Sequence, residues 1–322
     1  MLRRDLLRLT LALTALPSFH RAWAQAYPSK PIKLIVPAIP GSAPDVTART
    51  IGQVLASALG QAVVIDNKPG AASNVGLDAI AKSAPDGYTI GLGTSAMATN
   101  PWLYRKVSYD PVNDFTPVNL TFAMPHALIV QADSPAKSVS DLVRMLKADP
   151  GKYNYASGGN GSGAHLCAEL FKSMSATDVV HVPFRGAPEI VTAVIGGSVL
   201  FGFPTLSTAV PLVKSGRVRA LGVTGPRRNL ALPEVPPAAD TVPGMEFVSW
   251  LGIVGPANMP AEVVRRMDQE IRKALTDPAF RDKVQADGTE IIGLGHLEFA
   301  TYLRNELQKM KRVVELSGAK VD

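Results

Sequence analysis

Hydrophobic positions in the first part of the chain form short β-rich runs that alternate with segments of helical spacing. The run 32–36 predicts a strand, and the apolar residues that follow Asp45 lie on one face of a helix. Further strands are predicted at 63–65 and 88–92, with a helix at about 75–82. Such alternation indicates a parallel α/β sheet, in which ligands bind beyond the carboxyl ends of the strands. The loops 37–44 and 93–98 occupy this position.

The same pattern returns from about residue 138 onwards. The predicted elements are a helix to about 148, a short strand from Tyr153, a helix at 166–174, a strand at 179–182, a helix at 189–195 and strands at 199–203 and 218–223. Their strand-end loops are 157–162, 183–188 and 204–207. The proline-rich segment 226–243 is expected to be a surface excursion.

Two extended segments connect these units, near 122–130 and near 245–255. Three final helices are predicted at 261–276, 279–286 and 297–317. Because these helices need a sheet to cover, we expect the second α/β unit to be inserted into the first. Two crossovers form a hinge, and a hinge between α/β units forms a cleft that can close.

The stretch from Ser157 to His165 places glycines and serines directly before a helix. Glycine lets the backbone approach a ligand closely, and the first N–H groups of a helix attract anions. An ordinary strand–helix turn uses the same residue types, so both interpretations stay open for this loop alone. The spacing excludes a Walker loop and a nucleophile elbow, and it does not fit a dinucleotide-binding loop.

The first 26 residues are predicted to be an export signal. Arg3, Arg4 and Arg8 form a basic end, and the apolar run 6–16 is too short to span a bilayer. A small-x-small cleavage site ends at Ala24 or at Ala26. The arginine pair also suits a twin-arginine signal, so the general secretory route and the twin-arginine route both stay open.

Composition narrows the class of protein further. The chain has 322 residues, of which 46% are hydrophobic and 19% charged, so a packed core is expected. Loss of the signal, with its four arginines and one aspartate, lowers the formal charge from +6 to +3. No basic stripe with interleaved aromatic residues points to nucleic acid. Cys167 is the only cysteine, which excludes an internal disulfide and suggests a buried, unreactive thiol.

An enzyme is the main alternative class. Ser162 lies three residues before His165, and Glu169 lies one helical turn further, which imitates a hydrolase triad. No acid or oxyanion site is fixed by the pattern, so we expect His165 and His181 to be structural hydrogen-bonding groups and the chain not to be an enzyme. The histidines show no paired metal-ligand spacing, so neither a metal nor a cofactor is expected.

Motifs along the whole of the chain after the signal resemble one known family. They are Tyr27-Pro28-Ser29-Lys30-Pro31-Ile32, Val36-Pro37-x-x-Pro40-Gly41 with Asp45, Ala48 and Arg49, Asn67-Lys68-Pro69-Gly70-Ala71, Pro85-Asp86-Gly87-Tyr88-Thr89, Asn100-Pro101-x-Leu103-Tyr104, Tyr109-Asp110-Pro111, Gly161-Ser162 with His165-Leu166, His181-Val182-Pro183-Phe184-Arg185-Gly186, Leu232-Pro233-Glu234-Val235-Pro236 and Trp250-x-Gly252. This set resembles the Bug-type extracytoplasmic solute-binding proteins of tripartite tricarboxylate transporters.

The resemblance implies a periplasmic, two-lobed α/β fold, the type II periplasmic binding protein fold, with a two-strand hinge and flytrap closure. On this basis lobe 1 comprises 27–124 plus 251–322, and lobe 2 comprises 125–250, after the signal at 1–26. It also implies a carboxylate ligand, held mainly by loop N–H groups, hydroxyls and waters. The ligand would be delivered to a large and a small membrane subunit by a receptor that we expect to be a monomer.

The same resemblance assigns the ligand-binding residues to two walls. The first wall consists of Ile39, Pro40, Gly41, Ser42 and Ala43, with Thr94 and Ser95 beside them. The opposite wall consists of Ser157, Gly161, Ser162, Phe184, Arg185, Gly186, Pro204 and Thr205.

Departures from the family pattern bear on the ligand. The family usually has two glycines where this chain has Gly41-Ser42, and it often has an aspartate where this chain has Pro204. Because an aspartate there could pair with an amino group, its absence predicts a ligand without an ammonium group, such as a dicarboxylate or an aromatic acid. A receptor that signals to a membrane kinase would have the same sequence features, so the sensing role stays an alternative to transport.

Overall fold

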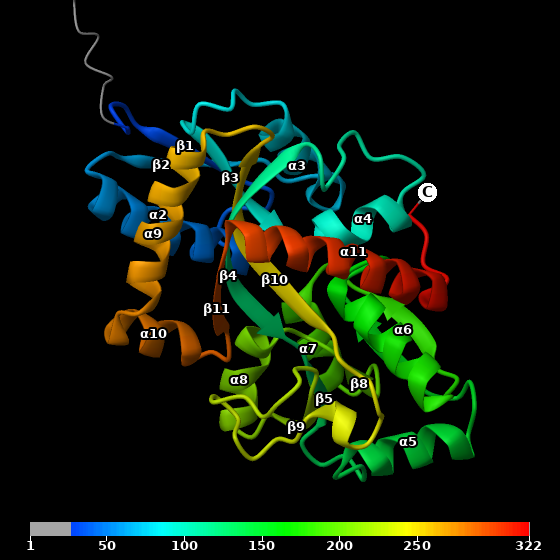
Figure 1. Cartoon of the computed structure of the whole chain (residues 1–322). Coiled ribbons are helices and arrows are strands. Elements are labelled where there is room, and N and C mark those ends of the chain that lie inside the picture. The colour runs from blue at the N-terminus through cyan, green and yellow to red at the C-terminus, as the bar shows by residue number, and fades with distance from the viewer. Residues whose placement is uncertain (1–26, 322) are drawn as a thin grey trace, which may run out of the picture.

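Two mixed β-sheets organise the chain in the computed structural model, which describes residues 27–321 apart from the side chain of Lys283 (Figure 1). The predicted export signal lies outside the described residues. The first sheet has the order β11-β4-β10-β3-β1-β2. Its strands are β1 (Ile32–Val36), β2 (Val63–Asn67), β3 (Thr89–Thr94), β4 (Phe115–Pro125), β10 (Val248–Pro256) and β11 (Glu290–Gly295). Strands β1, β2 and β3 are parallel, and β10 runs antiparallel to both of its neighbours.

The second sheet has the order β7-β6-β8-β5-β9. Its strands are β5 (Ala127–Gln131), β6 (Asn154–Ser157), β7 (Val180–Pro183), β8 (Phe201–Gly202) and β9 (Val218–Val223). Strand β6 is parallel to β7 and β8, whereas β5 is antiparallel to β8 and β9. The strand that runs antiparallel to both of its neighbours is β10 in the first sheet and β5 in the second. Each of these strands begins where the chain crosses between the two units.

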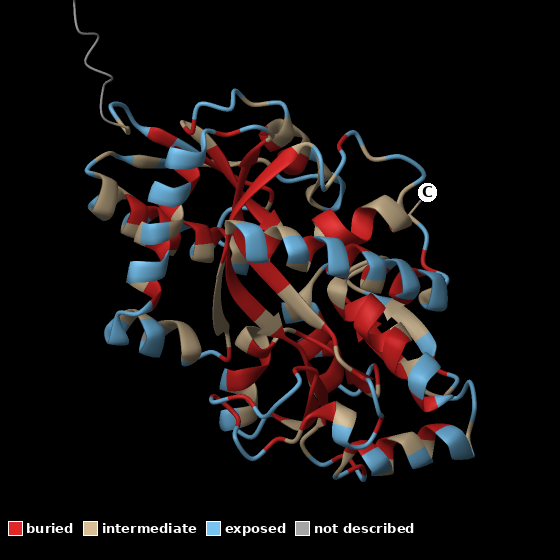
Figure 2. Ribbon diagram, in the orientation of Figure 1, coloured by how far each residue is buried: buried red, intermediate tan, exposed pale blue. Residues whose placement is uncertain are grey.

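Helices cover both faces of each sheet, and Figure 2 shows buried strands between helices whose outer sides are exposed. On the first sheet, α2 (Ala43–Leu59) and α9 (Ala261–Leu275) pack on one face, with α10 (Pro278–Gln285) beside them. The other face carries α3 (Asn74–Ala81), α4 (Ala96–Leu103) and α11 (His296–Ser317). On the second sheet, α5 (Val139–Ala148) and α6 (Gly163–Ser175) lie opposite α7 (Ala187–Ile195) and α8 (Leu206–Lys214).

Two paired strands join the lobes. Strand β4 leads into β5 through His126 alone, and β10 returns beside β4 with Val248 opposite Pro125. This arrangement confirms the predicted α/β fold with two lobes and a two-strand hinge. The lobe boundaries at 124/125 and 250/251 stay predictions.

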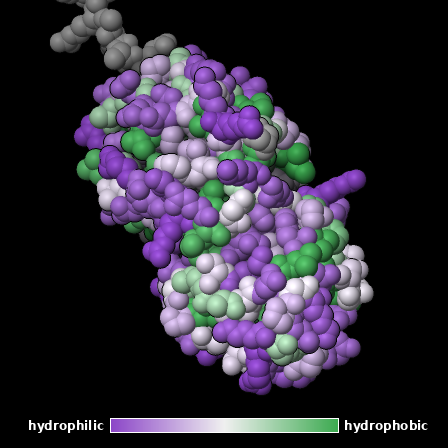
Figure 3. All heavy atoms as spheres, turned by 90° about the vertical axis from the view of Figure 1, so that its right-hand side faces the viewer, coloured by the Kyte–Doolittle hydropathy of each residue, from purple (hydrophilic) through white to green (hydrophobic). Residues whose placement is uncertain are grey.

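Helix α11 lies across the junction between the lobes, because it packs against α4 of lobe 1 and α6 of lobe 2 (Figure 1). Trp250 is fully buried, and its ring centroid lies 5.6 Å from that of Phe299 and 6.1 Å from that of Tyr302, both on α11. The apolar stripe of α11, which includes Phe299, Leu303 and Leu307, is thus buried in the core. The face that includes α6 and the end of α11 is mainly hydrophilic, with scattered hydrophobic areas (Figure 3).

Three elements differ from the sequence-based expectation. Strand β11 was not predicted, because its segment carries two glycines and no regular polar alternation. Helix α4 starts within the expected loop 93–98, since Ala96 and Met97 already belong to it. The expected surface excursion 226–243 is instead packed against the core, where Leu232, Val235, Ala238 and Val242 are buried.

Candidate functional site

The predicted site residues gather at the carboxyl ends of neighbouring strands. In lobe 1, β1 and β3 are adjacent and parallel, so the loop 37–42 lies next to Thr94 and Ser95. In lobe 2, β6 lies between β7 and β8, which brings together the loops after these three strands. The structure therefore places the candidates in two groups, one at the strand ends of each lobe. Whether each residue touches a ligand stays a prediction.

The ionised carboxylate of Asp45 holds the loop of the first wall in place. Asp45 is only 2% exposed, and its Oδ2 accepts the N–H of Gly41 at 2.8 Å and Nε of Arg49 at 2.9 Å. Its Oδ1 accepts the side-chain amide of Asn67 at 2.9 Å. These contacts, the one from Arg49 above all, lower the pKa of Asp45 to about 2. The charged form thus fixes the loop at neutral pH.

The surface of the first wall is open to solvent. Ile39 is 63% exposed, Pro40, Gly41 and Ala43 are also exposed, and Ser42 is half-buried at the N-cap of α2. The Ser42 hydroxyl donates to the carbonyl of Ile39 at 2.7 Å, so it closes the turn. Because the first N–H groups of a helix have no intrahelical acceptor, the start of α2 can offer backbone donors to an anion.

The glycine loop of the second wall is held by side-chain acceptors. The N–H of Gly161 donates to Nδ1 of His165 at 3.1 Å, and the N–H of Gly159 donates to Oγ of Ser157 at 3.1 Å. Ser162 caps α6, because its Oγ accepts the N–H of His165 at 3.3 Å. The loop and the helix start therefore offer fewer free N–H groups to an anion than the sequence suggested, because the N–H groups of Gly159, Gly161 and His165 are already bonded. The N–H groups of Gly163 and Ala164 in the first turn of α6 are the remaining helix-end donors.

A stack of neutral rings lies beneath this loop. The rings of His165 and His181 are 4.2 Å apart, and the ring of Tyr155 lies 5.0 Å from that of His181. His181 Nε2 is 2.5 Å from the Ser157 hydroxyl. Burial, with some repulsion from His181, lowers the pKa of His165 to about 4, and burial also lowers the pKa of His181. Both rings are therefore expected to be neutral at pH 7.

The triad of Ser162, His165 and Glu169 that the sequence imitates is not assembled in this geometry. His165 Nδ1 accepts a backbone N–H, and Ser162 Oγ accepts another, so neither forms a nucleophile–base pair with the other. Glu169 accepts the Tyr155 hydroxyl and pairs with Lys172 at 2.9 Å. Cys167 is buried as expected, and burial raises the pKa of its thiol.

The other loops of lobe 2 lie against the glycine loop. The N–H of Phe184 donates to the carbonyl of Ser157 at 2.9 Å. A Cβ on Gly158 would lie 3.3 Å from Cα of Gly186, so the two loops are in close contact. Arg185 is exposed, and its backbone N–H donates to Glu189 at 3.1 Å. These loops form one continuous surface.

Pro204 and Thr205 form the base of the second wall. Pro204 is buried, and its carbonyl accepts the N–H of Ala127 at 2.9 Å. Thr205 is half-buried, and its hydroxyl lies 3.1 Å from that of Ser207. The structure therefore places Pro204 inside lobe 2, and its effect on the ligand stays a prediction.

The two walls meet at the start of β10, which the sequence did not mark as part of the site. Ser95, the N-cap of α4, accepts the N–H of Trp250 through its Oγ at 2.7 Å. A Cβ placed on Gly163 would lie 3.2 Å from Oγ of the adjacent Ser249. The first turns of α4 and α6, from opposite lobes, therefore converge on consecutive residues of one hinge strand. The proximity of this segment to the Trp250-x-Gly252 motif was its only signal in the sequence.

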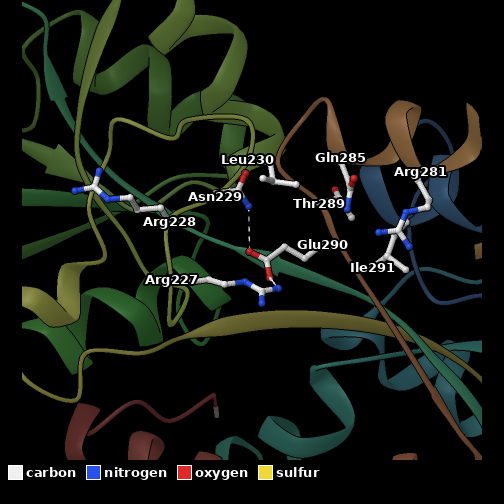
Figure 4. A pocket seen from close by; sticks show the side chains of 9 residues that line it. All are labelled: Arg227, Arg228, Asn229, Leu230, Arg281, Gln285, Thr289, Glu290 and Ile291. Atoms are coloured by element: carbon white, nitrogen blue, oxygen red, sulfur yellow. Dashed lines mark hydrogen bonds and ion pairs between the residues drawn. The ribbon is translucent and has the colours of Figure 1, made fainter. Parts of the chain in front are cut away.

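A second contact between the lobes surrounds a cavity of about 370 Å³ (Figure 4). Asn229 of the packed excursion donates to the carbonyl of Gly288 at 3.0 Å and to Glu290 at 3.1 Å. The arginines around the cavity point in different directions in Figure 4. Arg228 bonds the carbonyls of Pro233 and Glu234, and Arg227 lies 3.6 Å from Glu290. This cavity therefore lacks converging cations for an anion.

Two kinds of feature are absent from residues 27–321. No group of three or more His, Cys, Asp or Glu side chains in this part of the chain is placed to hold a metal ion. Among the helices of the same residues, none combines the length and the apolar character needed to cross a membrane.

Comparison with known proteins identifies the family. Residues 47–319 match the model of the tripartite tricarboxylate transporter family receptor. The chain belongs to this receptor family. This confirms the resemblance to Bug-type proteins, and the matched family consists of solute-binding receptors.

Relatives of this receptor family match over nearly the whole chain. A Pseudomonas sp. strain P51 protein encoded in the tcbD-tcbE intergenic region is 33% identical over 97% of this chain and 93% of its own length. Protein BugT of Bordetella pertussis is 31% identical over 92% of both chains.

Solved structures of this receptor family have the same fold. The R. palustris protein Rpa4515 with adipate is 31% identical, with a TM-score of 0.83 over 91% of this chain and 99% of its own. MatC of Rhodopseudomonas palustris with bound malate is 27% identical, with a TM-score of 0.76 over 89% of this chain and 100% of its own. The periplasmic binding protein BugD is 26% identical, with a TM-score of 0.79 over 91% of this chain and 99% of its own.

Proposed function

We propose that this receptor binds a small carboxylate in the cleft between its lobes, in the periplasm, and delivers it to the large and small membrane subunits of a tripartite tricarboxylate transporter. One observation carries the proposal: the first turns of α4 and α6 approach the consecutive residues Trp250 and Ser249 from opposite lobes. Two helix N-termini directed at one place favour a negatively charged group there.

The available donors are sufficient for useful affinity. A micromolar dissociation constant corresponds to about 8 kcal/mol of binding free energy. One hydrogen bond to a charged group contributes about 1.5–3 kcal/mol, and a partly buried helix terminus adds up to ~2 kcal/mol. Four to six such contacts from the two walls would reach that level after the cost of ordering the ligand. The net charge contributes little, because salt screens it within about 8 Å.

The ligand class follows from the residues at two positions of the site, 204 and 39. Pro204 leaves no carboxylate at the base of the second wall to pair with an ammonium group, and the exposed Ile39 offers an apolar contact. A dicarboxylate or an aromatic acid therefore fits better than an amino acid. The related structures with adipate and malate support a dicarboxylate. A sensor that presents its closed form to a membrane kinase is the alternative role.

Mass spectrometry of ligand released from the purified protein, followed by calorimetry with carboxylates and amino acids, tests this function. We expect a plain dicarboxylate or aromatic acid to bind more tightly than aspartate or glutamate. Tighter binding of an amino acid than of every plain carboxylate would refute the ligand class. Turnover of any bound acid would instead indicate an enzyme.

A matched pair of serine variants tests the location. Ser162 and Ser138 both cap a helix, and the Oγ of each accepts an N–H three residues later. Each change to alanine should cost about 1 kcal/mol of stability. Only Ser162→Ala should also weaken carboxylate binding, by roughly three- to tenfold, because it disturbs the first turn of α6. Equal dissociation constants for the two variants would contradict a site at this turn.

A further inference from the structure

The hinge contains a polar pair, His126 and Ser249, with one member on each crossover segment. His126 lies between β4 and β5 and is only 3% exposed. Its Nε2 is 3.0 Å from Oγ of Ser249, which lies near the start of β10 and is half-buried. Neither residue was expected from the sequence to belong to the site.

The bonding partners of His126 determine its tautomer. Its Nδ1 lies 2.7 Å from the carbonyl oxygen of Phe203, which can only accept, so Nδ1 carries the proton. Burial lowers the pKa of His126 to about 4, so the ring is neutral at pH 7. Nε2 is then an acceptor, and the only proton of the Ser249 hydroxyl is directed at it.

This bond determines what Ser249 can offer to a ligand. With its proton donated to His126, Oγ presents only lone pairs to any other group. Among the described residues, no donor is bonded to this oxygen. Gly163 at the start of α6 faces it without a side chain, and a Cβ there would lie 3.2 Å from Oγ and 3.4 Å from Cε1 of His126. The oxygen thus lies beside the helix end at which the ligand carboxylate is proposed to bind.

We propose that Ser249 determines specificity by accepting a hydrogen bond from a hydroxyl group next to the bound carboxylate, with His126 as the residue that positions its oxygen. This inference rests on the proposed carboxylate function and refines the ligand to a 2-hydroxycarboxylate. A hydroxyl group on the carbon next to the carboxylate can donate to Oγ while the carboxylate accepts from the first turn of α6. A carboxylate oxygen at the same place would be repelled, since two acceptors cannot bond.

Matched acid pairs test the proposal by calorimetry: succinate against malate, and glutarate against 2-hydroxyglutarate. The protein should bind at least one hydroxy acid about three- to tenfold more tightly than its partner without the hydroxyl group, which is the range of one neutral hydrogen bond. Ser249→Ala should reduce that ratio to about one. Ser198→Ala makes the same chemical change at an exposed serine of lobe 2 and should leave the ratio intact.

The outcomes separate this inference from the proposed function. If the acids bind but the hydroxyl group gives no gain, or if the gain persists in Ser249→Ala, the role of Ser249 is refuted while carboxylate binding stands. If no acid binds, the carboxylate function fails and this inference fails with it. Should Ser249→Ala not fold, Ser249→Cys provides the test, because sulfur is a weak acceptor and should lose most of the gain.

Discussion

The two walls of the proposed site are built alike and fixed by opposite means. Each is a loop from a strand to a helix, and in each a side chain of the helix accepts an N–H of the loop four residues earlier. In the first wall the acceptor is the ionised Asp45, which also bonds Arg49 and Asn67. In the second wall the acceptor is the neutral His165, stacked on His181. The same bond from a loop N–H to a helix side chain therefore requires the charged form of Asp45 in the first wall and the neutral form of His165 in the second.

The difference gives the walls different responses to acid. The pKa of Asp45 is lower in the folded state than the ordinary 3.8, so its contribution to stability is complete above pH 3.8 and is lost as pH falls to about 2. The pKa of His165 is also lowered, from 6.5 to about 4, but here the neutral form is the stabilising one. Its contribution is complete above pH 6.5 and is lost as pH falls towards 4. Acid should therefore weaken the second wall first.

Removal of the charge from the first wall should have the largest effect. In Asp45→Asn, three donors around a buried site lose an ionised acceptor, which should cost about 2–4 kcal/mol of unfolding free energy. The exposed half of the Arg49 side chain limits the share of that ion pair. Urea unfolding measures the stability, and calorimetry should show at least a tenfold weaker carboxylate affinity.

Asp141→Asn is the matched control for that change. Asp141 also lies in the first turn of a helix, accepts the N–H four residues earlier, from Lys137, and pairs with an arginine. It lies in α5, and its side chain is 30% exposed. The control should lose much less stability and no affinity. A loss in Asp45→Asn no larger than in this control would show that the charge does not fix the wall.

Acid titration should give the next largest effect. Between pH 6.5 and 4 the unfolding free energy should fall, with His165 contributing up to about 3 kcal/mol, because the unfolded chain binds a proton that the folded ring resists. His126, whose pKa is lowered in the same way, adds to this loss. In His165→Asn, an amide oxygen can still accept the Gly161 N–H while nothing titrates. Urea unfolding at several pH values should show a smaller slope for the variant in this window, and an unchanged slope would contradict the assignment.

Glycine substitutions separate backbone strain from contact between the lobes. Gly161 has φ +76°, and a Cβ there would lie 3.1 Å from side-chain atoms of Leu103 and Val321 in lobe 1. Gly216 has φ +70° with nothing within 4 Å. Gly216→Ala should therefore cost about 1 kcal/mol, and Gly161→Ala roughly 2 kcal/mol, by thermal or urea unfolding. Equal losses would mean that the second wall does not press on lobe 1 in solution.

Much of the fold was predictable because periodicity reports burial within one element. Two strands have the bounds that were predicted, 32–36 and 218–223, and helix α11 starts one residue earlier than predicted. Strand β11 and helix α4 were missed for a physical reason. Both depend on neighbours that are distant in the sequence: β11 pairs with β4, and α4 contains Pro101 and packs against α11.

The site was predictable only where strand-end loops and family motifs coincide. The loops 37–44 and 157–162 could be named from the sequence, but the acceptors that fix them could not. The spacing of four residues between Gly161 and His165 fits a turn, a cap and a triad equally well. The pair of His126 and Ser249 is 123 residues apart in the chain, so only the fold brings it together.

The smallest predicted effect concerns the turn that supports the first wall. Ala71, Ala72 and Ser73 all have positive φ values, and Ser73 Oγ donates to the carbonyl of Pro37 at 3.0 Å. Ala72 has φ 47°, a conformation that suits glycine, and its carbonyl accepts the side-chain amide of Asn100 at 2.8 Å. Ala72→Gly should stabilise the protein by about 0.5–1 kcal/mol, since relief of strain exceeds the extra entropy of the unfolded chain.

The same change at Ala79, inside α3, should destabilise the protein by a similar amount. Urea unfolding of the two variants should thus give shifts of opposite sign, with carboxylate affinity unchanged because the side chains of Ser73 and Asn100 still hold the turn. A loss of stability in Ala72→Gly would mean that this turn is not strained.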